Sequence, residues 1–195
     1  MDKSLSYNRE IINWGYLLGY LGLFLVLPPI IGLPFILYVV WKKSHPKYSD
    51  YLLLMACIAI YFGSINATKH PDGDQINYYV AYLNVPVIGF VKSLIYIYGT
   101  DYFVDPGKVH ISGEFMNGVY NYFGYYLTFG YYPLFAALYT FVEYLMIYLG
   151  LYKVFRKAQM PKYPIVCGVL ILSFFYLFFQ YTLQIQKQFF AQAIM

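Results

Sequence analysis

YYPLFAALYTFVEYLMIYLGLY (residues 131–152) is an apolar run that contains one charged residue, Glu143. Its length is close to the roughly 20 apolar residues with which an α-helix spans a bilayer. Three further apolar runs occupy residues 14–41, 51–65 and 163–180. The runs are continuous and do not alternate as the strands of a membrane β-barrel do, so they predict helices. The sequence therefore predicts four clear membrane spans.

The composition agrees with an integral membrane protein. Hydrophobic residues make up 61% of the chain and charged residues 11%, whereas about a quarter of a soluble domain is charged. The start of the chain is too acidic, and the run after it too long, for a cleaved signal peptide, so the first span is retained. Cys57 and Cys167 lie within apolar runs and are interpreted as small hydrophobic residues. We predict an all-α, polytopic transmembrane helix bundle that forms one membrane domain over residues 1–195.

Two parts of this bundle depart from a simple span. The first run contains LPPIIGLP (residues 27–34), whose prolines are predicted to kink it. Between the second and third runs, VPVIGFVKSLIYIYGTDYF (residues 85–103) and FMNGVYNYFGYYLTFG (residues 115–130) are apolar but broken by Gly, Asn, Lys and Asp. They predict either two tight spans in a hairpin or two amphipathic helices in the membrane interface. Both alternatives return the chain to the same side.

Charge predicts the orientation. Residues 66–130 carry three lysines and five acidic residues, a net charge of −2. Since basic links face the cytoplasm, the acidic region and the end of the chain are predicted to face outward, and the net charge of +4 reflects orientation, not nucleic-acid binding. The basic residues lie in two links between apolar runs, with Lys42, Lys43 and Lys47 in the first and Lys153, Arg156, Lys157 and Lys162 in the second.

The last residues, QIQKQFFAQAIM (184–195), carry polar side chains in an apolar setting. Glutamines recur every four residues from Gln180, and Lys187 lies on the same helical face beside Gln184 and Gln188. One interpretation is that the lysine snorkels to the interface while the glutamines join helices. The other is a polar site. Because the sequence stops inside a short helix, we expect an N-terminal portion of a longer polytopic protein.

Two stretches resemble the EpsG-type, Wzy-like polysaccharide polymerases of O-antigen and exopolysaccharide synthesis. QIQKQFFAQAI (184–194) is similar to a motif in which arginine, glutamine and alanine take the places of Lys187, Gln188 and Ala191. Lysine keeps the charge of arginine but loses its bidentate fork. HPDGDQINYYVAYLN (70–84) resembles the outward loop of the family, in which glycine and aspartate precede a tyrosine-rich segment. The residues of this chain that match the glycine, the aspartate and the tyrosines of that loop are Gly73, Asp74, Tyr78 and Tyr82.

The resemblance implies a GT-C-like glycosyltransferase without a metal or other cofactor. It would act at the outer face of the bacterial cytoplasmic (inner) membrane, on oligosaccharides linked to polyprenyl diphosphate, together with other polysaccharide-assembly proteins. Lys187 would bind the diphosphate, and Asp74 would accept the proton of the acceptor hydroxyl, with Asp72 and then His70 as the next candidates. The predicted substrate-binding residues are Asp72, Tyr78, Tyr82, Glu114, Gln184 and Gln188.

Other interpretations of the same residues stay open. PDGD (71–74) is also typical of an exposed turn, and many of the 26 tyrosines fit an interfacial belt. Glu143 is interpreted as a structural residue with a buried partner such as a tyrosine hydroxyl. The alternative functions are another lipid-sugar glycosyltransferase, a transporter or flippase, and a non-catalytic membrane scaffold.

Overall fold

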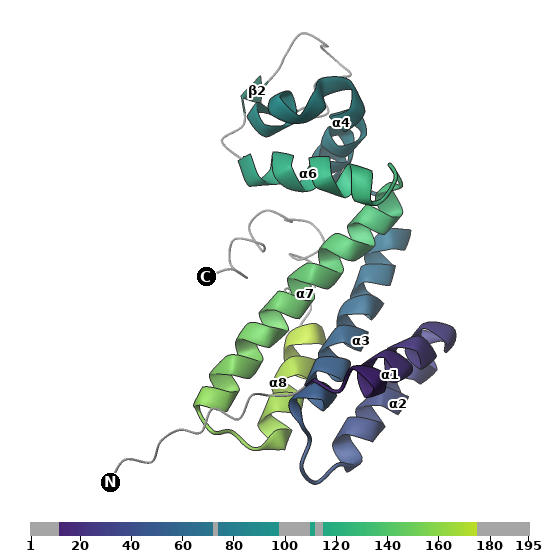
Figure 1. The fold of residues 1–195 in the computed structure, drawn as a ribbon, viewed down its shortest axis with the longest axis vertical. Helices are drawn as coiled ribbons and strands as arrows, with labels where there is room; N and C mark the ends of the chain where they lie inside the picture. Colours follow the sequence, from purple (N-terminus) through teal and green to yellow (C-terminus); the bar gives the residue numbers. More distant parts are fainter. Residues whose placement is uncertain (1–11, 72–73, 98–109, 112–114, 175–195) are drawn as a thin grey trace.

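The structure, a computed structural model, describes residues 12–71, 74–97, 110–111 and 115–174. Within these ranges the chain is helical, as predicted, apart from one antiparallel pair of two-residue strands. Figure 1 shows α3 and α7 side by side along the long axis, with the other helices around their two ends. The elements are α1 (Trp14–Val26), α2 (Pro29–Lys42), α3 (Tyr48–Thr68), α4 (Asp74–Ile95), β1 (Tyr96–Ile97), β2 (His110–Ile111), α6 (Phe115–Leu127), α7 (Tyr132–Lys157) and α8 (Lys162–Phe174).

Two helices of the described residues, α3 and α7, are long and apolar enough to cross a membrane. With 21 and 26 residues they measure about 32 and 39 Å, compared with a hydrocarbon core of about 30 Å. They correspond to the runs predicted at residues 51–65 and 131–152. The run predicted at residues 163–180 begins with α8, and its residues after Phe174 lie outside the described ranges.

The span predicted over residues 14–41, with a kink at its prolines, is not confirmed as one span, because the chain breaks there into two helices. α1 ends at Val26, and Leu27 has an extended backbone because the residue before a proline disfavours the helical conformation. Pro29 then starts α2, at a position where its missing N–H costs no hydrogen bond. The two helices have 13 and 14 residues, about 20 Å each. Each is too short to span alone.

Polar contacts bring the start of α1 and the end of α2 together at the start of α3. The Lys43 Nζ, just after α2, donates to the Tyr16 hydroxyl at 3.1 Å and to the Asp50 carboxylate at 2.5 Å. The Asn13 N–H, just before α1, donates to the Ser49 hydroxyl at 3.0 Å. Burial alone would lower the pKa of Lys43, but the bonds to Asp50 and Tyr16 outweigh it and raise this pKa. The α1–α2 pair is therefore a hairpin that returns to the end where it began.

A close approach of backbones joins α3 to α7. A Cβ added to Gly63 would lie 2.7 Å from the Ala137 carbonyl oxygen, so only glycine permits this spacing without displacement of the helices. Next to it, the rings of Phe62 and Tyr144 stack with centroids 4.8 Å apart. The contact leaves no room for a side chain at residue 63.

The helices α4 and α6 lie across the end of the α3–α7 pair (Figure 1). α4 is kinked at Gly89, whose φ of 71° is a left-handed conformation that glycine tolerates. α6 has 13 residues, too few to span, and turns into α7 through Phe129 and Gly130, both with positive φ. Neither α4 nor α6 is among the helices of the described residues that are long and apolar enough to cross a membrane.

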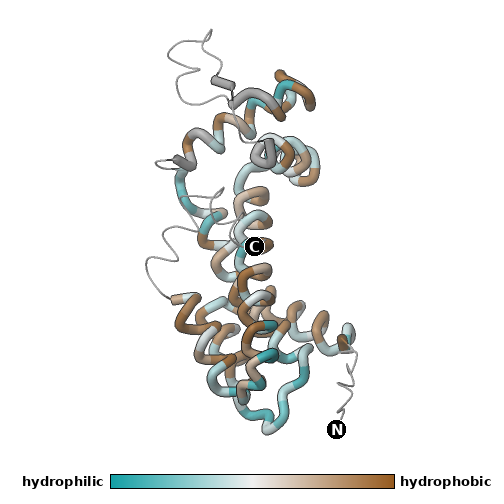
Figure 2. Tube along the Cα trace, turned by 90° about the vertical axis from the view of Figure 1, so that its left-hand side faces the viewer, coloured by the Kyte–Doolittle hydropathy of each residue, from teal (hydrophilic) through white to brown (hydrophobic). Residues whose placement is uncertain are grey.

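Polar and apolar residues separate along the molecule. Figure 2 shows a hydrophilic stretch at the end that holds the two basic links and further hydrophilic residues toward the other end, with hydrophobic residues along the helices between them. Large apolar side chains also face outward, with Val26 and Ile30 each 83% exposed and Ile171 70% exposed. Exposed apolar surface of this extent needs a partner or a lipid environment.

Gly63→Ala tests the close approach of α3 and α7. We expect the free energy of unfolding to fall by about 1–3 kcal/mol, because the new methyl group meets a helix backbone. Gly150→Ala on α7 is the matched control, since a Cβ there meets nothing within 4 Å. Thermal unfolding of both purified variants in detergent measures the difference. Equal stability of the two variants would contradict the proposed packing.

Candidate functional site

The predicted site residues fall into two groups. Asp74 is the first residue of α4, and Tyr78 and Tyr82 follow it one and two turns along the same helix. The others lie outside the described residues, so their predicted roles stay predictions; they are Asp72, Glu114, Gln184, Lys187 and Gln188. The structure thus brings the start of α4 and its tyrosines to the end of α7 that lies away from the basic links.

Tyr82 belongs to an aromatic cluster that joins α4, α6 and α7. Its side chain is fully buried, its hydroxyl forms a 2.6 Å hydrogen bond with the Thr128 hydroxyl, and its ring stacks on Phe135 at 4.8 Å. Burial raises the pKa of Tyr82, and the bond to Thr128 opposes this rise without cancelling it. The ring that was predicted to contact substrate therefore packs inside the protein. The cluster consists of Tyr79, Tyr82, Tyr125, Tyr132, Phe135, Ala136 and Tyr139.

Glu143 is a buried carboxyl group near the middle of α7. Its side chain has no exposed surface, and among the described residues neither of its oxygens makes a hydrogen bond of standard geometry. The hydroxyl groups of Tyr139 and Tyr120 are nevertheless close enough to interact with it. Tyr78 is also buried and interacts with Tyr139. These four residues form a polar cluster, and Tyr139 is a tyrosine partner of the kind that the sequence predicted for Glu143.

A second polar pair extends this cluster toward α3. The Asn66 side-chain amide donates to the Thr140 hydroxyl at 2.8 Å, and both groups are buried. Thr140 and Glu143 are three residues apart and so share a face of α7. The uncharged Asn66 and Thr140 side chains bond to each other. Burying a carboxyl group costs free energy unless it has partners, and a carboxyl group that stays buried in a membrane helix is therefore a candidate functional residue.

The polar cluster borders a cavity of about 360 Å³ between α6 and α7. Its lining is almost entirely apolar and includes Tyr120 and Tyr139 together with Phe123, Leu127 and Val142. Burial, followed by the nearby Glu143 carboxylate, raises the pKa of Tyr120, so its hydroxyl remains a proton donor at neutral pH. The cavity can hold an apolar chain.

Several site features are absent from the part of the chain that the structure describes. There, no three His, Cys, Asp or Glu side chains lie close enough to hold a metal ion. Cys57 and Cys167 are unpaired, the first buried and the second exposed. The sequence did indicate Glu143, because it is an acidic residue within an apolar run. It could not connect Glu143 with Tyr120, because the two residues lie in separate helices and no spacing rule relates them.

Comparisons with protein-family models, with curated proteins and with solved structures find no match to this chain. No family is assigned on this basis.

Glu143→Gln separates a functional carboxyl group from a structural one. Glutamine keeps the volume and removes the ionisable carboxyl group, so we expect the melting temperature to stay at the wild-type value. Thr140→Val is the comparison, because it leaves the buried Asn66 amide without its acceptor and should cost about 1–3 kcal/mol. A loss of stability in Glu143→Gln as large as that in Thr140→Val would show that the carboxylate is structural.

Proposed function

We propose that this chain is a membrane protein in which α3 and α7 cross the bilayer, with both basic links in the cytoplasm. The lengths of the two helices, the outward-facing apolar side chains and the lysine and arginine residues of the two basic links support this arrangement. The α1–α2 hairpin then enters the membrane and returns to the cytoplasmic side. α4 and α6 lie at the outer surface, and α8 starts a further span.

The proposed activity is that of a polysaccharide polymerase, as the sequence resemblance implies. It acts on oligosaccharides linked to polyprenyl diphosphate, at the outer face of a bacterial cytoplasmic membrane. The observation that carries this proposal is the apolar cavity between α6 and α7, whose lining includes Tyr120 and Tyr139, both close to the buried Glu143 carboxyl group. An isoprenoid tail suits the apolar wall, and sugar hydroxyls suit tyrosines.

The proposed reaction transfers a glycan to the hydroxyl group of the next lipid-linked unit. The bond between the anomeric carbon and the diphosphate oxygen breaks, and a bond from the acceptor oxygen to that carbon forms. The acceptor proton passes to a base, for which Asp74 at the start of α4 is the candidate. The leaving diphosphate carries the electron pair away, and the Lys187 ammonium stabilises its charge.

A transporter or flippase is the second candidate, and Glu143 favours it. Carboxyl groups buried within membrane-spanning helices often relay protons in transporters. The two functions differ in the residue that they require. Transport would depend on Glu143 and tolerate Asp74→Asn, whereas polymerisation would depend on Asp74.

Polymer length at the native chromosomal locus tests the polymerase proposal. We expect Asp74→Asn and Lys187→Ala to leave single repeat units in place of long chains on an electrophoretic profile, by a loss of about 100-fold or more, since a general base typically contributes 10²–10⁴-fold. Lys92→Ala on α4 and Asp105→Asn are the matched controls and should give long chains. Normal chain length in both site variants, with wild-type protein levels in the membrane, would refute the proposal.

A further inference from the structure

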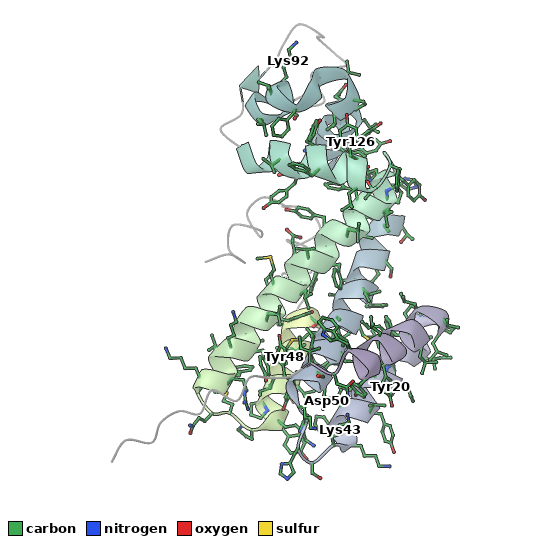
Figure 3. The ribbon with its side chains drawn as sticks, in the orientation of Figure 1. Tyr20, Lys43, Tyr48, Asp50, Lys92 and Tyr126 are labelled. Carbon is green, nitrogen blue, oxygen red and sulfur yellow. The ribbon has the colours of Figure 1, made fainter. Side chains whose placement is uncertain are left out.

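A second and larger cavity lies at the opposite end of the molecule. Its volume is about 770 Å³, and it opens between the α2–α3 link and the α7–α8 link. Figure 3 shows this end, where Lys43 and Asp50 point toward each other. The side chains that give the cavity its character are Trp41, Lys42, His45, Tyr51, Arg156 and Lys162.

The lining of this basic cavity is positively charged. Lys42, Arg156 and Lys162 contribute three cationic groups from two separate links, and no carboxylate of the described residues lines the cavity. Asp50, the acid at the start of α3, is engaged elsewhere. It accepts hydrogen bonds from the Lys43 Nζ and from the backbone N–H of Lys47. The cavity is thus suited to an anion.

Lys162 fixes the shape of the cavity. Its Nζ donates to the backbone carbonyl oxygens of Trp41 at 2.8 Å and of Lys43 at 2.7 Å, which ties the two links together. The same Nζ lies 4.7 Å from the centroid of the Tyr163 ring. The rings of Trp41 and Tyr163 pack with centroids 4.8 Å apart and form an aromatic wall. Lys162 is therefore held in place, whereas the side chains of Lys42 and Arg156 are exposed.

We propose that this basic cavity binds a phosphate group, carried by the headgroup of an anionic lipid. A phosphate presents several oxygens to separate cations, and the Arg156 guanidinium can bind two of them side by side. The hydroxyl groups of Tyr51 and Ser44, which also line the cavity, are further donors. Tryptophan and tyrosine are enriched at the membrane surface, where lipid phosphates lie.

Orientation of the chain alone does not account for this arrangement. The positive-inside rule requires only charge in the links, and Lys47, Lys153 and Lys157 provide such charge without lining the cavity. This difference supplies a matched control. Lys42→Gln/Arg156→Gln removes one cation from each link inside the cavity, and Lys47→Gln/Lys157→Gln removes one from each link outside it.

The experiment measures binding to the purified protein in detergent, by the shift of its melting temperature and by native mass spectrometry. Phosphatidylglycerol, phosphatidylcholine and inorganic phosphate are the three probes. We expect phosphatidylglycerol to raise the melting temperature more than phosphatidylcholine does. The cavity variant should bind it about tenfold or more weakly, while the control variant should bind as the wild type does. Circular dichroism confirms that both variants are folded.

Three outcomes would overturn the proposal. Equal weakening in the cavity and control variants would show that binding follows overall charge and not this cavity. Equal stabilisation by phosphatidylglycerol and phosphatidylcholine would show that an anionic headgroup is not required. The third outcome is that inorganic phosphate stabilises the wild type but not the cavity variant, while phosphatidylglycerol stabilises neither protein. The site would then bind a soluble phosphate, and the lipid assignment would fail. Because the readout is binding, none of these outcomes depends on polymerase activity.

Discussion

The contact of α3 with α7 is the constraint on which the rest of the structure depends. Gly63 lets the backbones approach until no Cβ fits between residue 63 and the Ala137 carbonyl, and the stacked rings of Phe62 and Tyr144 fill the neighbouring space. This antiparallel pair is the longest apolar unit of the described chain. Its two ends decide where the links, the cavities and the short helices can lie.

The two ends have opposite chemistry. One end holds lysine and arginine around a polar cavity, with Lys162 joining the links through backbone carbonyls. The other end holds tyrosines around an apolar cavity, with Glu143 buried behind it. In a bilayer these ends would meet the two leaflets, so one protein would offer a phosphate site on one face and a site for a lipid-linked sugar on the other.

The sequence predicted the parts of this fold that depend on apolar length. The runs at residues 51–65 and 131–152 became α3 and α7 because continuous apolar residues favour one long helix. The run at 14–41 did not, because the prolines at 28 and 29 divide it and the Lys43 contacts fold its halves together, a tertiary effect that hydropathy does not report. Likewise, Tyr82 looked like an exposed ring, but its packing depends on Thr128, 46 residues away.

The most direct test of this account is the side of the membrane from which single cysteines react. After Cys57→Ala and Cys167→Ala, the single variants Trp14→Cys, Ser44→Cys, Gln159→Cys and Tyr131→Cys would be treated in intact cells with a membrane-impermeant maleimide. The account predicts that Tyr131→Cys reacts from outside and that the other three react only after the cells are opened. Labelling of Gln159→Cys and Tyr131→Cys from the same side would show that α7 does not cross the membrane.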